Sequence, residues 1–324
     1  MDKLSRQDSE ERFKPRCTVV IPTRDRPSEL DRCLKAVTSL DYPRFDVLVV
    51  DNAPSDERTR EAAARWGARY VVEPRLGVNR ARNCGARASE AEIVAYLDDD
   101  AVPERSWLSE LVSEFRNPRV MAVAGRILPL QVVTEAERLF ASRGGFDSGE
   151  EQRSVDLHTR HWFEMTNFGG LGSEANMAFR RSAFDIWPGF NERIGYGTPL
   201  PGGGGPYAFF SLIERGYRVV YTPRAVVSHP SPQTLEALRS RHRRTLAASA
   251  GYCTLLFFEH PSYRGAVVRF LAGWFSSTPR VWRGQGAGPR PRIVPRWCEL
   301  LACLPGPLLY ARALLAYKLS RRGS

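Results

Sequence analysis

Three adjacent carboxylates, Asp98, Asp99 and Asp100, follow directly after the apolar run 93–97. Such a run predicts a buried strand, so the carboxylates gather at its carboxyl end. Ionised side chains this close repel one another, and a divalent cation bound through oxygen relieves the repulsion. Mg²⁺ and Mn²⁺ prefer oxygen ligands and can in turn hold a diphosphate. We therefore expect a Mg²⁺ or Mn²⁺ site here; an exposed acidic turn after a strand is the alternative.

Short apolar runs alternate with helical patterns over the first 128 residues. The predicted order is strand 17–22, helix 27–40, strand 47–51, helix 55–66, strand 70–72, helix 79–88 and strand 93–97. This alternation indicates an α/β domain with a mainly parallel sheet covered by helices on both faces. Ligands of such sheets bind beyond the carboxyl ends of the strands, so Thr23, Asp51 and the carboxylates at 98–100 should converge on one crevice.

Beyond residue 128 the pattern is less regular, and the polar stretch 131–168 allows no assignment. Further elements are predicted at 120–127, at 176–181 with a helix to Trp187, at 207–215, at 218–221 and at 225–229. The segment 195–206 contains four consecutive glycines, which hold a fixed conformation only at a high entropic cost. We expect it to be a mobile loop beside the site, with a plain linker as the alternative.

The composition, 324 residues with 43% hydrophobic, is that of a folded globular protein with a substantial core. The six cysteines are scattered without a C-x-x-C pair, which favours neither a zinc site nor a disulfide framework and suits a reducing, cytoplasmic setting. Residues 1–16 are charged and polar, with no apolar segment of the kind a secretory signal needs. We expect them to form a mobile tail.

The net charge of +11 lies entirely in the C-terminal part of the chain. Residues 1–238 carry 32 basic and 34 acidic side chains, whereas residues 239–324 carry 15 basic and 2 acidic ones. Apolar runs interleave with these arginines, a combination that favours contact with an anionic membrane surface. Helices packed on the main domain with a solvated basic face are the alternative.

No nucleic-acid motif is present in this region. Pro305-Gly306-Pro307 interrupts its longest apolar run before the run reaches the length of a membrane span.

Six segments stand in an order typical of one protein family. They are VIPTRDRP at 20–27, VVDN at 49–52, GVNRARNCG at 77–85, LDDD at 97–100, NMAFRR at 176–181, and GY at 216–217 leading to His229. Over roughly residues 17 to 230 the chain therefore resembles the family 2 glycosyltransferases, which have a GT-A fold. The resemblance implies a mainly parallel nucleotide-binding sheet flanked by helices, here with a C-terminal helical extension.

The resemblance also implies a binding site for the nucleoside of a nucleotide sugar. Its implied members are Pro22, Thr23, Arg26 and Asp51. A carboxylate such as Asp51 can accept from a base N–H or a ribose hydroxyl, which agrees with this role. Arg80 and Arg82 would face the base or the diphosphate. A guanidinium group can donate two hydrogen bonds at once to phosphate oxygens, which agrees with this role. A solvated helix face is the alternative for these two arginines.

For the metal, the resemblance points to a D-x-D motif made of Asp98 and Asp100, with Asp99 counted among the nucleotide-sugar contacts. Asp100 is the strongest metal-ligand candidate. His229 is similar to a histidine that supplies a further metal ligand in some relatives, although a capping or partly buried histidine is the alternative. The implied cofactor is Mn²⁺ or Mg²⁺, which together with Asp100 would stabilise the leaving diphosphate.

The reaction implied is displacement of a nucleoside diphosphate by an acceptor, with inversion, which requires a general base. Relatives place a Glu-Asp pair at the end of the glycine-rich loop, and alignment puts that pair on Gly204-Gly205. The segment 194–213 contains no Asp, Glu or His. Glu174 stands where a small residue is expected and is our candidate base, followed by Glu192 and Glu214. Ordinary surface glutamates are the alternative for all three.

Two functional hypotheses remain open. The first is a metal-dependent transferase acting in cell-surface polysaccharide, glycolipid or natural-product glycosylation, cytoplasmic or peripheral on the inner face of the membrane, with a lipid-linked or membrane-near acceptor. The second is a catalytically silent relative that binds a nucleotide sugar or partners an active transferase. A sugar nucleotidyltransferase is disfavoured, because 21–27 contains no glycine for a phosphate loop.

We divide the chain into a tail (1–16), a transferase domain (17–232, with halves 17–128 and 129–232) and a basic helical region (233–324).

Overall fold

The structure is a computed structural model that describes residues 13–276 and 291–320. Residues 1–12 of the predicted tail (1–16), and residues 277–290 and 321–324 of the predicted basic helical region (233–324), therefore lie outside the described residues. Within them, nine strands form one sheet in the order β3-β2-β1-β4-β8-β6-β9-β5, with β7 paired to β9. The strands are β1 Cys17–Thr23, β2 Phe45–Asn52, β3 Arg69–Glu73, β4 Ile93–Leu97, β5 Val102–Pro103, β6 Val120–Pro129, β7 Arg153–Val155, β8 Asn176–Arg180 and β9 Arg218–His229.

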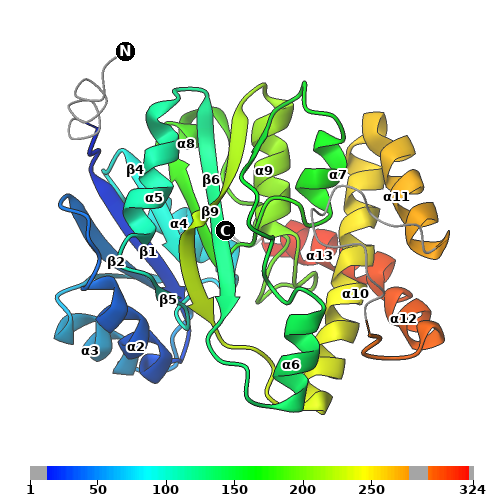
Figure 1. The fold of residues 1–324 in the computed structure, drawn as a ribbon, viewed down its shortest axis with the longest axis horizontal. Helices are drawn as coiled ribbons and strands as arrows, with labels where there is room; N and C mark the ends of the chain where they lie inside the picture. Colours follow the sequence, from blue (N-terminus) through cyan, green and yellow to red (C-terminus); the bar gives the residue numbers. More distant parts are fainter. Residues whose placement is uncertain (1–12, 277–290, 321–324) are drawn as a thin grey trace.

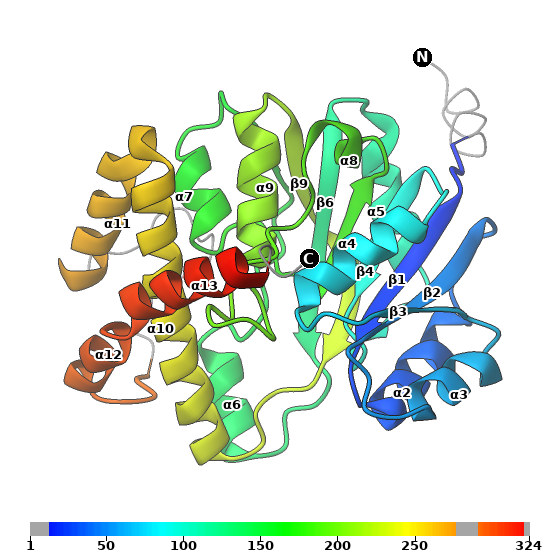
Figure 2. The ribbon, with the colours of Figure 1, turned by 180° about the vertical axis from the view of Figure 1, so that it is seen from behind.

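Helices cover both faces of this sheet (Figures 1 and 2). The α-helices that precede the C-terminal helical extension are α2 Pro27–Val37, α3 Arg58–Arg65, α4 Val78–Ala88, α5 Trp107–Ser113, α6 Glu135–Ser142, α7 Trp162–Asn167, α8 Ala183–Ile186 and α9 Gly204–Glu214. Neighbouring residues of β1 point to opposite faces, so Val19 joins a core cluster with α2, α3 and α5, and Val20 one with α4, α8 and α9. The predicted α/β class is confirmed.

The predicted order of strands and helices over the first 128 residues is also confirmed, with ends that differ by up to three residues. The runs 218–221 and 225–229, predicted separately, form the single strand β9. The unassigned stretch 131–168 contains α6, β7 and α7. These elements are only 8, 3 and 6 residues long, too short for a repeating apolar pattern to stand out in the sequence.

The antiparallel strand β8 brings the second half of the chain to the carboxyl edge of the parallel strands. It pairs with β4, so its first residue Asn176 lies opposite Leu97. The loop before β8 therefore lies beside the turn after β4, and the Asp98 N–H donates to the Ala175 carbonyl at 3.4 Å. This pairing places Glu174 next to the carboxylates at 98–100.

The glycine-rich segment differs from the mobile loop that we expected. Helix α9 begins at Gly204, three residues before the predicted start. Of the four consecutive glycines only Gly203, at the N-terminus of the helix, has a positive φ, +83°. The preceding residues are held by hydrogen bonds, since the Val78 N–H donates to the Tyr196 carbonyl and the Asn79 side chain donates to the Ile194 carbonyl. Small residues allow this helix start to pack closely against neighbouring side chains.

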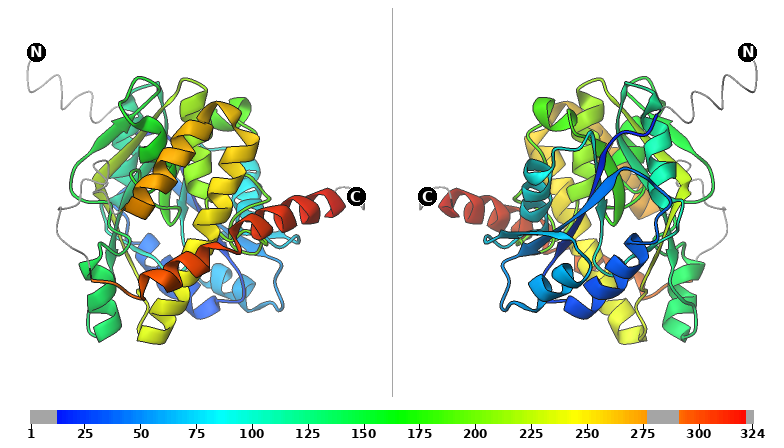
Figure 3. Two further views of the ribbon diagram at one scale, coloured as in Figure 1. Left: turned by 90° about the vertical axis from the view of Figure 1, so that its right-hand side faces the viewer. Right: turned by 90° about the vertical axis from the view of Figure 1, so that its left-hand side faces the viewer.

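The predicted C-terminal helical extension is confirmed. It contains α10 Leu235–Glu259, α11 Arg264–Ser276, α12 Arg296–Cys303 and α13 Gly306–Ser320. Helix α10 packs on the domain through Tyr252, Leu255 and Leu256. Helix α13 extends away from the body of the molecule (Figure 3). By length and composition the segment Arg296–Ser320 could cross a membrane, although Pro305 marks a turn between α12 and α13.

Candidate active site and metal centre

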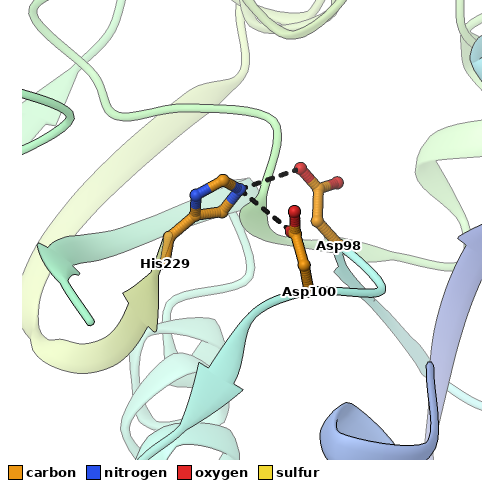
Figure 4. A group of neighbouring side chains, drawn as sticks. All are labelled: Asp98, Asp100 and His229. Carbon is orange, nitrogen blue, oxygen red and sulfur yellow. Dashed lines mark ion pairs between the residues drawn. The ribbon is translucent and has the colours of Figure 1, made fainter. Parts of the chain in front are cut away.

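Three side chains from distant parts of the sequence converge at the edge of the sheet. The ligand atoms of Asp98, Asp100 and His229 all lie within 4.8 Å of one another, and the side chains point toward a common centre (Figure 4). His229 Nε2 lies 3.1 Å from Asp100 Oδ1 and 3.9 Å from Asp98 Oδ2. The short strand β5 explains the approach, because its pairing with the end of β9 carries the turn after β4 toward His229.

The tautomer of His229 favours a cation at this centre. Its Nδ1 lies 2.8 Å from the Pro230 carbonyl, which can only accept, so Nδ1 carries the proton. In the neutral ring Nε2 therefore presents a lone pair to two carboxylates. Asp100 Oδ1 is buried and accepts no hydrogen bond within the described residues. Two carboxylate oxygens and an imidazole nitrogen form a donor set that suits Mn²⁺ or Mg²⁺, so the residues present fit the predicted metal.

The protonation of these groups follows from burial and charge. Burial alone would lower the pKa of His229, but the proximity of Asp100 and Asp98 outweighs it and raises that pKa. Burial alone would raise the pKa of Asp100, but the neighbouring His229 and Arg26 outweigh burial, so the pKa is lowered. Burial raises the pKa of Asp98. Without a cation, the histidine can thus carry the compensating positive charge itself.

The middle carboxylate faces a different way from its neighbours. Asp99 accepts from the Thr23 hydroxyl and from Arg26 Nη1, each at 2.7 Å, while Arg26 Nη2 donates to Asp100 at 2.7 Å. Burial raises the pKa of Asp99 to about 7. Thr23 and Asp99 are therefore brought together as predicted, and Arg26 joins them; their contacts with a nucleotide sugar stay a prediction. Asp99 ties the end of β1 to the turn after β4, whereas Asp98 and Asp100 face the metal centre.

Asp51 lies on the neighbouring strand with one oxygen unused. Its Oδ2 accepts from the Tyr70 hydroxyl at 2.8 Å, whereas its buried Oδ1 has no hydrogen-bond partner among the described residues. Burial raises the pKa of Asp51. Pro22 pairs with Val50 beside it, at the carboxyl end of β1. An unsatisfied buried acceptor can take an N–H or hydroxyl from a ligand. Tyr70 was not identified from the sequence, because nothing in the pattern of β3 marks it.

The two arginines of α4 face carboxylates. Arg82 is buried, donates to Glu174 Oε2 at 2.5 Å and lies 3.7 Å from Asp98 Oδ1. Arg80 lies 3.8 Å from Glu192 Oε2 and is also largely buried. Neither is a solvated helix residue. Arg82 thus connects the candidate base with a candidate metal ligand.

Glu174 fills the space beside the two glycines that begin α9. A Cβ added at Gly205 would lie 2.6 Å from Glu174 Cγ, and one at Gly204 would lie 3.1 Å from Glu174 Oε2. These contacts place the Glu174 carboxylate where the sequence lacks the carboxylates expected at 204–205. Glu214, by contrast, is the last residue of α9 and lies 3.8 Å from His260, at the other end of that helix.

An aromatic residue that the sequence did not single out lies against the metal centre. The ring centroids of Phe146 and His229 are 4.8 Å apart. The guanidinium carbon of Arg241, a residue of α10, lies 4.6 Å from the centroid of the Phe146 ring. Phe146 belongs to the polar stretch that gave no assignment. Phe146 therefore lies directly beside a candidate metal ligand.

Comparison with known proteins gives consistent matches. The sequence profile described as "Glycosyl transferase family 2" matches residues 18–187. The "Pre-mycofactocin glycosyltransferase" of Mycobacterium tuberculosis is 32% identical over 253 residues, 78% of this chain and 49% of that protein. "Glycosyltransferase AglE" of Haloferax volcanii is 35% identical over 121 residues, covering 35% and 40%. The chain thus spans about half the length, or less, of these relatives.

Solved structures share the fold. A mannosyltransferase, PcManGT from Pyrobaculum calidifontis in complex with GDP-Man and Mn²⁺, has a TM-score of 0.55 at 19% identity, covering 97% of this chain and 77% of that one. The TarS 1–349 structure of S. aureus has a TM-score of 0.51 at 15% identity, covering 95% and 92%. At these identities the likeness establishes the fold alone, and it confirms the GT-A type predicted from the sequence.

Proposed function

Because the chain belongs to the family 2 glycosyltransferases, we propose that it transfers a sugar from a nucleoside diphosphate sugar to an acceptor in a metal-dependent, inverting reaction. The observation that carries this proposal is the convergence of Asp98, Asp100 and His229 at the same carboxyl edge of the sheet as the orphaned acceptor of Asp51, with β1 between β2 and β4. One set of groups suits a divalent cation and the other suits a nucleoside. A nucleoside diphosphate joins these two chemistries in one ligand.

Asp98, Asp100 and His229 would hold Mn²⁺ or Mg²⁺, which would neutralise the charge that develops on the leaving diphosphate. Mn²⁺ is also the ion named for the PcManGT complex. Asp99 supports this centre indirectly, because its bonds to Thr23 and Arg26 fix the turn that carries both carboxylates. The exposed part of the Arg26 side chain adds positive charge at the same edge.

The nucleoside would lie along the carboxyl ends of β1 and β2. Asp51 Oδ1 would accept from a base N–H or a ribose hydroxyl, with Pro22 and Thr23 forming the neighbouring wall. Arg80 would also take part in binding, since its buried Nε has no hydrogen-bond partner among the described residues, although Glu192 Oε2 lies 3.8 Å away.

The acceptor hydroxyl would lose its proton to Glu174 as its oxygen attacks the anomeric carbon. The bond from that carbon to the diphosphate oxygen breaks, and the nucleoside diphosphate leaves with the bonding electrons. Arg82 orients the Glu174 carboxylate through Nη1, and Asn79 in turn accepts from the same Nη1 at 2.9 Å. The absence of side chains at 204–205 leaves Glu174 as the carboxylate on this side of the described site.

A second candidate is a silent relative that binds a nucleotide sugar without transferring it. The replacement of the expected Glu-Asp pair by Gly204-Gly205 favours it. So does the ion pair with Arg82, which occupies one oxygen of Glu174. The transferase is preferred because Glu174 fills the vacated space while the rest of the site is intact.

We further propose a cytoplasmic location, peripheral on the inner face of the membrane, with a lipid-linked or membrane-near acceptor. This rests on the excess of 15 basic over 2 acidic residues in 239–324. Cell-surface polysaccharide, glycolipid and natural-product glycosylation are the processes in which such an acceptor would occur.

The test is a titration of the protein with UDP-, dTDP- and GDP-sugars in the presence of Mn²⁺, following donor binding and release of free nucleoside diphosphate. We expect one donor to bind and to be turned over with metal, and Asp100→Asn to abolish both effects. Asp185→Asn, a change to an exposed carboxylate on α8, is the matched control. Tight binding without release, even with acceptors added, would favour the silent relative, and no binding at all would contradict both candidates.

A further inference from the structure

The first half of helix α10 lies between α6 and α12, at the end of the molecule where β9 ends (Figure 1). His229 of the metal centre is the last residue of β9. Two adjacent residues of α10 establish its position between the two helices. The Arg241 guanidinium lies over the Phe140 ring of α6 at 5.8 Å, whereas His242 Nε2 lies 3.1 Å from Glu299 Oε1 of α12. The same half of α10 also carries three arginines that are exposed to solvent. They are Arg239, Arg243 and Arg244.

An exposed apolar loop borders this helix on the side of the active site. Leu130, Val132 and Val133 follow β6, and Val133 is 66% exposed. The Leu130 N–H donates to the His229 carbonyl at 2.9 Å, so the loop continues directly from the metal centre. Arg138 of α6 donates to the Val133 carbonyl at 2.7 Å, which places a further cation beside these apolar side chains.

A second exposed apolar element borders α10 on the other side. Trp297, Leu301 and Leu304 of α12 and its following turn are largely exposed, Leu304 to 71%. The exposure continues into α13 at Leu308 and Leu315. Only 11% of the most apolar stretch of Arg296–Ser320 is buried, which is not the pattern of a core helix in a water-soluble domain. We call the loop 130–133, the exposed arginines of α10, and α12 with its following turn the α10 rim.

We infer that the α10 rim docks on an anionic lipid surface and holds the opening of the active site against it. Exposed aliphatic and Trp side chains enter the interface between headgroups and acyl chains, while arginines beside them attract anionic headgroups. A nucleic acid would require stacking aromatics along the arginines, and those present stand among aliphatic residues. A second copy of the chain would bring the same excess of positive charge to the contact and be repelled.

This inference deepens the proposed function, on which it rests for the acceptor, since a lipid-linked acceptor would then meet His229 and Glu174 at the membrane. The docking itself is independent of donor chemistry. Each exposed arginine within reach of an anionic surface contributes to partitioning, and replacing all three should weaken it on the order of 100-fold. Apolar insertion should fail separately when carboxylates replace Val133 and Leu304.

The test measures sedimentation of the full chain with vesicles of phosphatidylcholine alone and with an equal mixture of phosphatidylcholine and phosphatidylglycerol. The variants are Val133→Asp/Leu304→Asp and Arg239→Gln/Arg243→Gln/Arg244→Gln. Matched controls are Ile186→Asp, a 40% exposed apolar residue of α8, and Arg32→Gln, an exposed arginine of α2. We expect binding only to the anionic vesicles, lost in both variants and kept in both controls.

Several results would overturn the inference. They are wild-type protein that does not sediment with anionic vesicles, variants that sediment as well as the wild type, and wild-type protein that high salt and alkaline carbonate fail to release, which would mean a spanning helix. Donor binding is measured in parallel without vesicles and should be equal in all proteins. If the wild type binds no donor, that result counts against the proposed function alone. Vesicle binding would still test whether the α10 rim docks on an anionic lipid surface.

Discussion

The Glu174 side chain occupies the space that any side chain at Gly205 would need. A Cβ at position 205 would lie 2.6 Å from Glu174 Cγ, closer than real Cβ contacts come. Glu174 comes from the loop before β8, and Gly205 from the first turn of α9, so two elements far apart in the sequence share one volume. The missing carboxylates at 204–205 and the unexpected one at 174 are therefore parts of a single arrangement.

This relationship predicts a stability effect that depends on both positions. Gly205→Ala should destabilise the wild-type fold by about 1–3 kcal/mol, because the added methyl would clash with the Glu174 side chain. In a Glu174→Ala background the same change should cost much less, since the space is then open. Denaturant unfolding of the four proteins measures the coupling. Equal costs in both backgrounds would show that the two positions are independent.

The two outer carboxylates and the middle one should behave differently toward metal. Asp100→Asn removes a group that faces His229, so Mn²⁺ affinity should fall by at least about tenfold. Asp99→Asn should lower Mn²⁺ affinity much less, because Asp99 supports the centre only through its bonds to Thr23 and Arg26. Calorimetric titration with Mn²⁺ and a nucleoside diphosphate compares them. An equal loss in both variants would contradict the assignment of Asp99.

Asp51→Asn should separate binding from stability. Asp51 Oδ1 is buried without a partner, and burial raises the pKa of this carboxyl, so removing its charge should leave the free energy of unfolding at pH 7 unchanged or higher. Nucleoside diphosphate affinity should fall on the order of tenfold, because a charged acceptor is lost. Thermal melts and calorimetry test both effects. Unchanged affinity would place the nucleoside elsewhere.

The ion pair between Asp156 and Arg218 should make stability depend on acidic pH. Arg218 Nη2 donates to Asp156 Oδ2 at 2.6 Å, and this bond lowers the Asp156 pKa below its usual 3.8. A carboxyl with a lowered pKa stabilises the fold above pH 3.8, and the contribution disappears as pH falls through the folded-state value. Asp156→Asn should therefore cost about 1 kcal/mol at pH 7. The difference between the two proteins should vanish in unfolding experiments at acidic pH; a constant difference would assign the effect to packing.

Sequence patterns predicted the parallel half of the fold because β1, β4 and the second half of β2 are buried on both faces and read as continuous apolar runs. They also located the carboxylates at 98–100 and His229, whose chemistry is visible in residue type and in position after an apolar run. They could not show that Asp99 turns away from its neighbours, since that depends on side-chain direction at a turn. Nor could they place Phe146, which reaches His229 only through the folding of an irregular segment.

The start of α9 was misplaced for a related reason. Glycines at 204–205 have low helix propensity, so the pattern favoured a loop there. The structure uses their small size instead, since a side chain at either position would contact Asn79 or Glu174. Tertiary packing outweighs local propensity at this point. The contact between Glu174 and the glycines is long-range and leaves no local signal in the sequence.

The most direct measurement is the acceptor-dependent rate of nucleoside diphosphate release by the wild type, Glu174→Ala, Gly205→Asp and the double variant, with donor affinity measured for each. Loss of a general base should slow Glu174→Ala on the order of 10²–10⁴-fold while its donor affinity is kept. The double variant, which returns a carboxylate from α9 to the vacated space, should recover a large part of that loss. A Glu174→Ala protein as fast as the wild type would contradict the account.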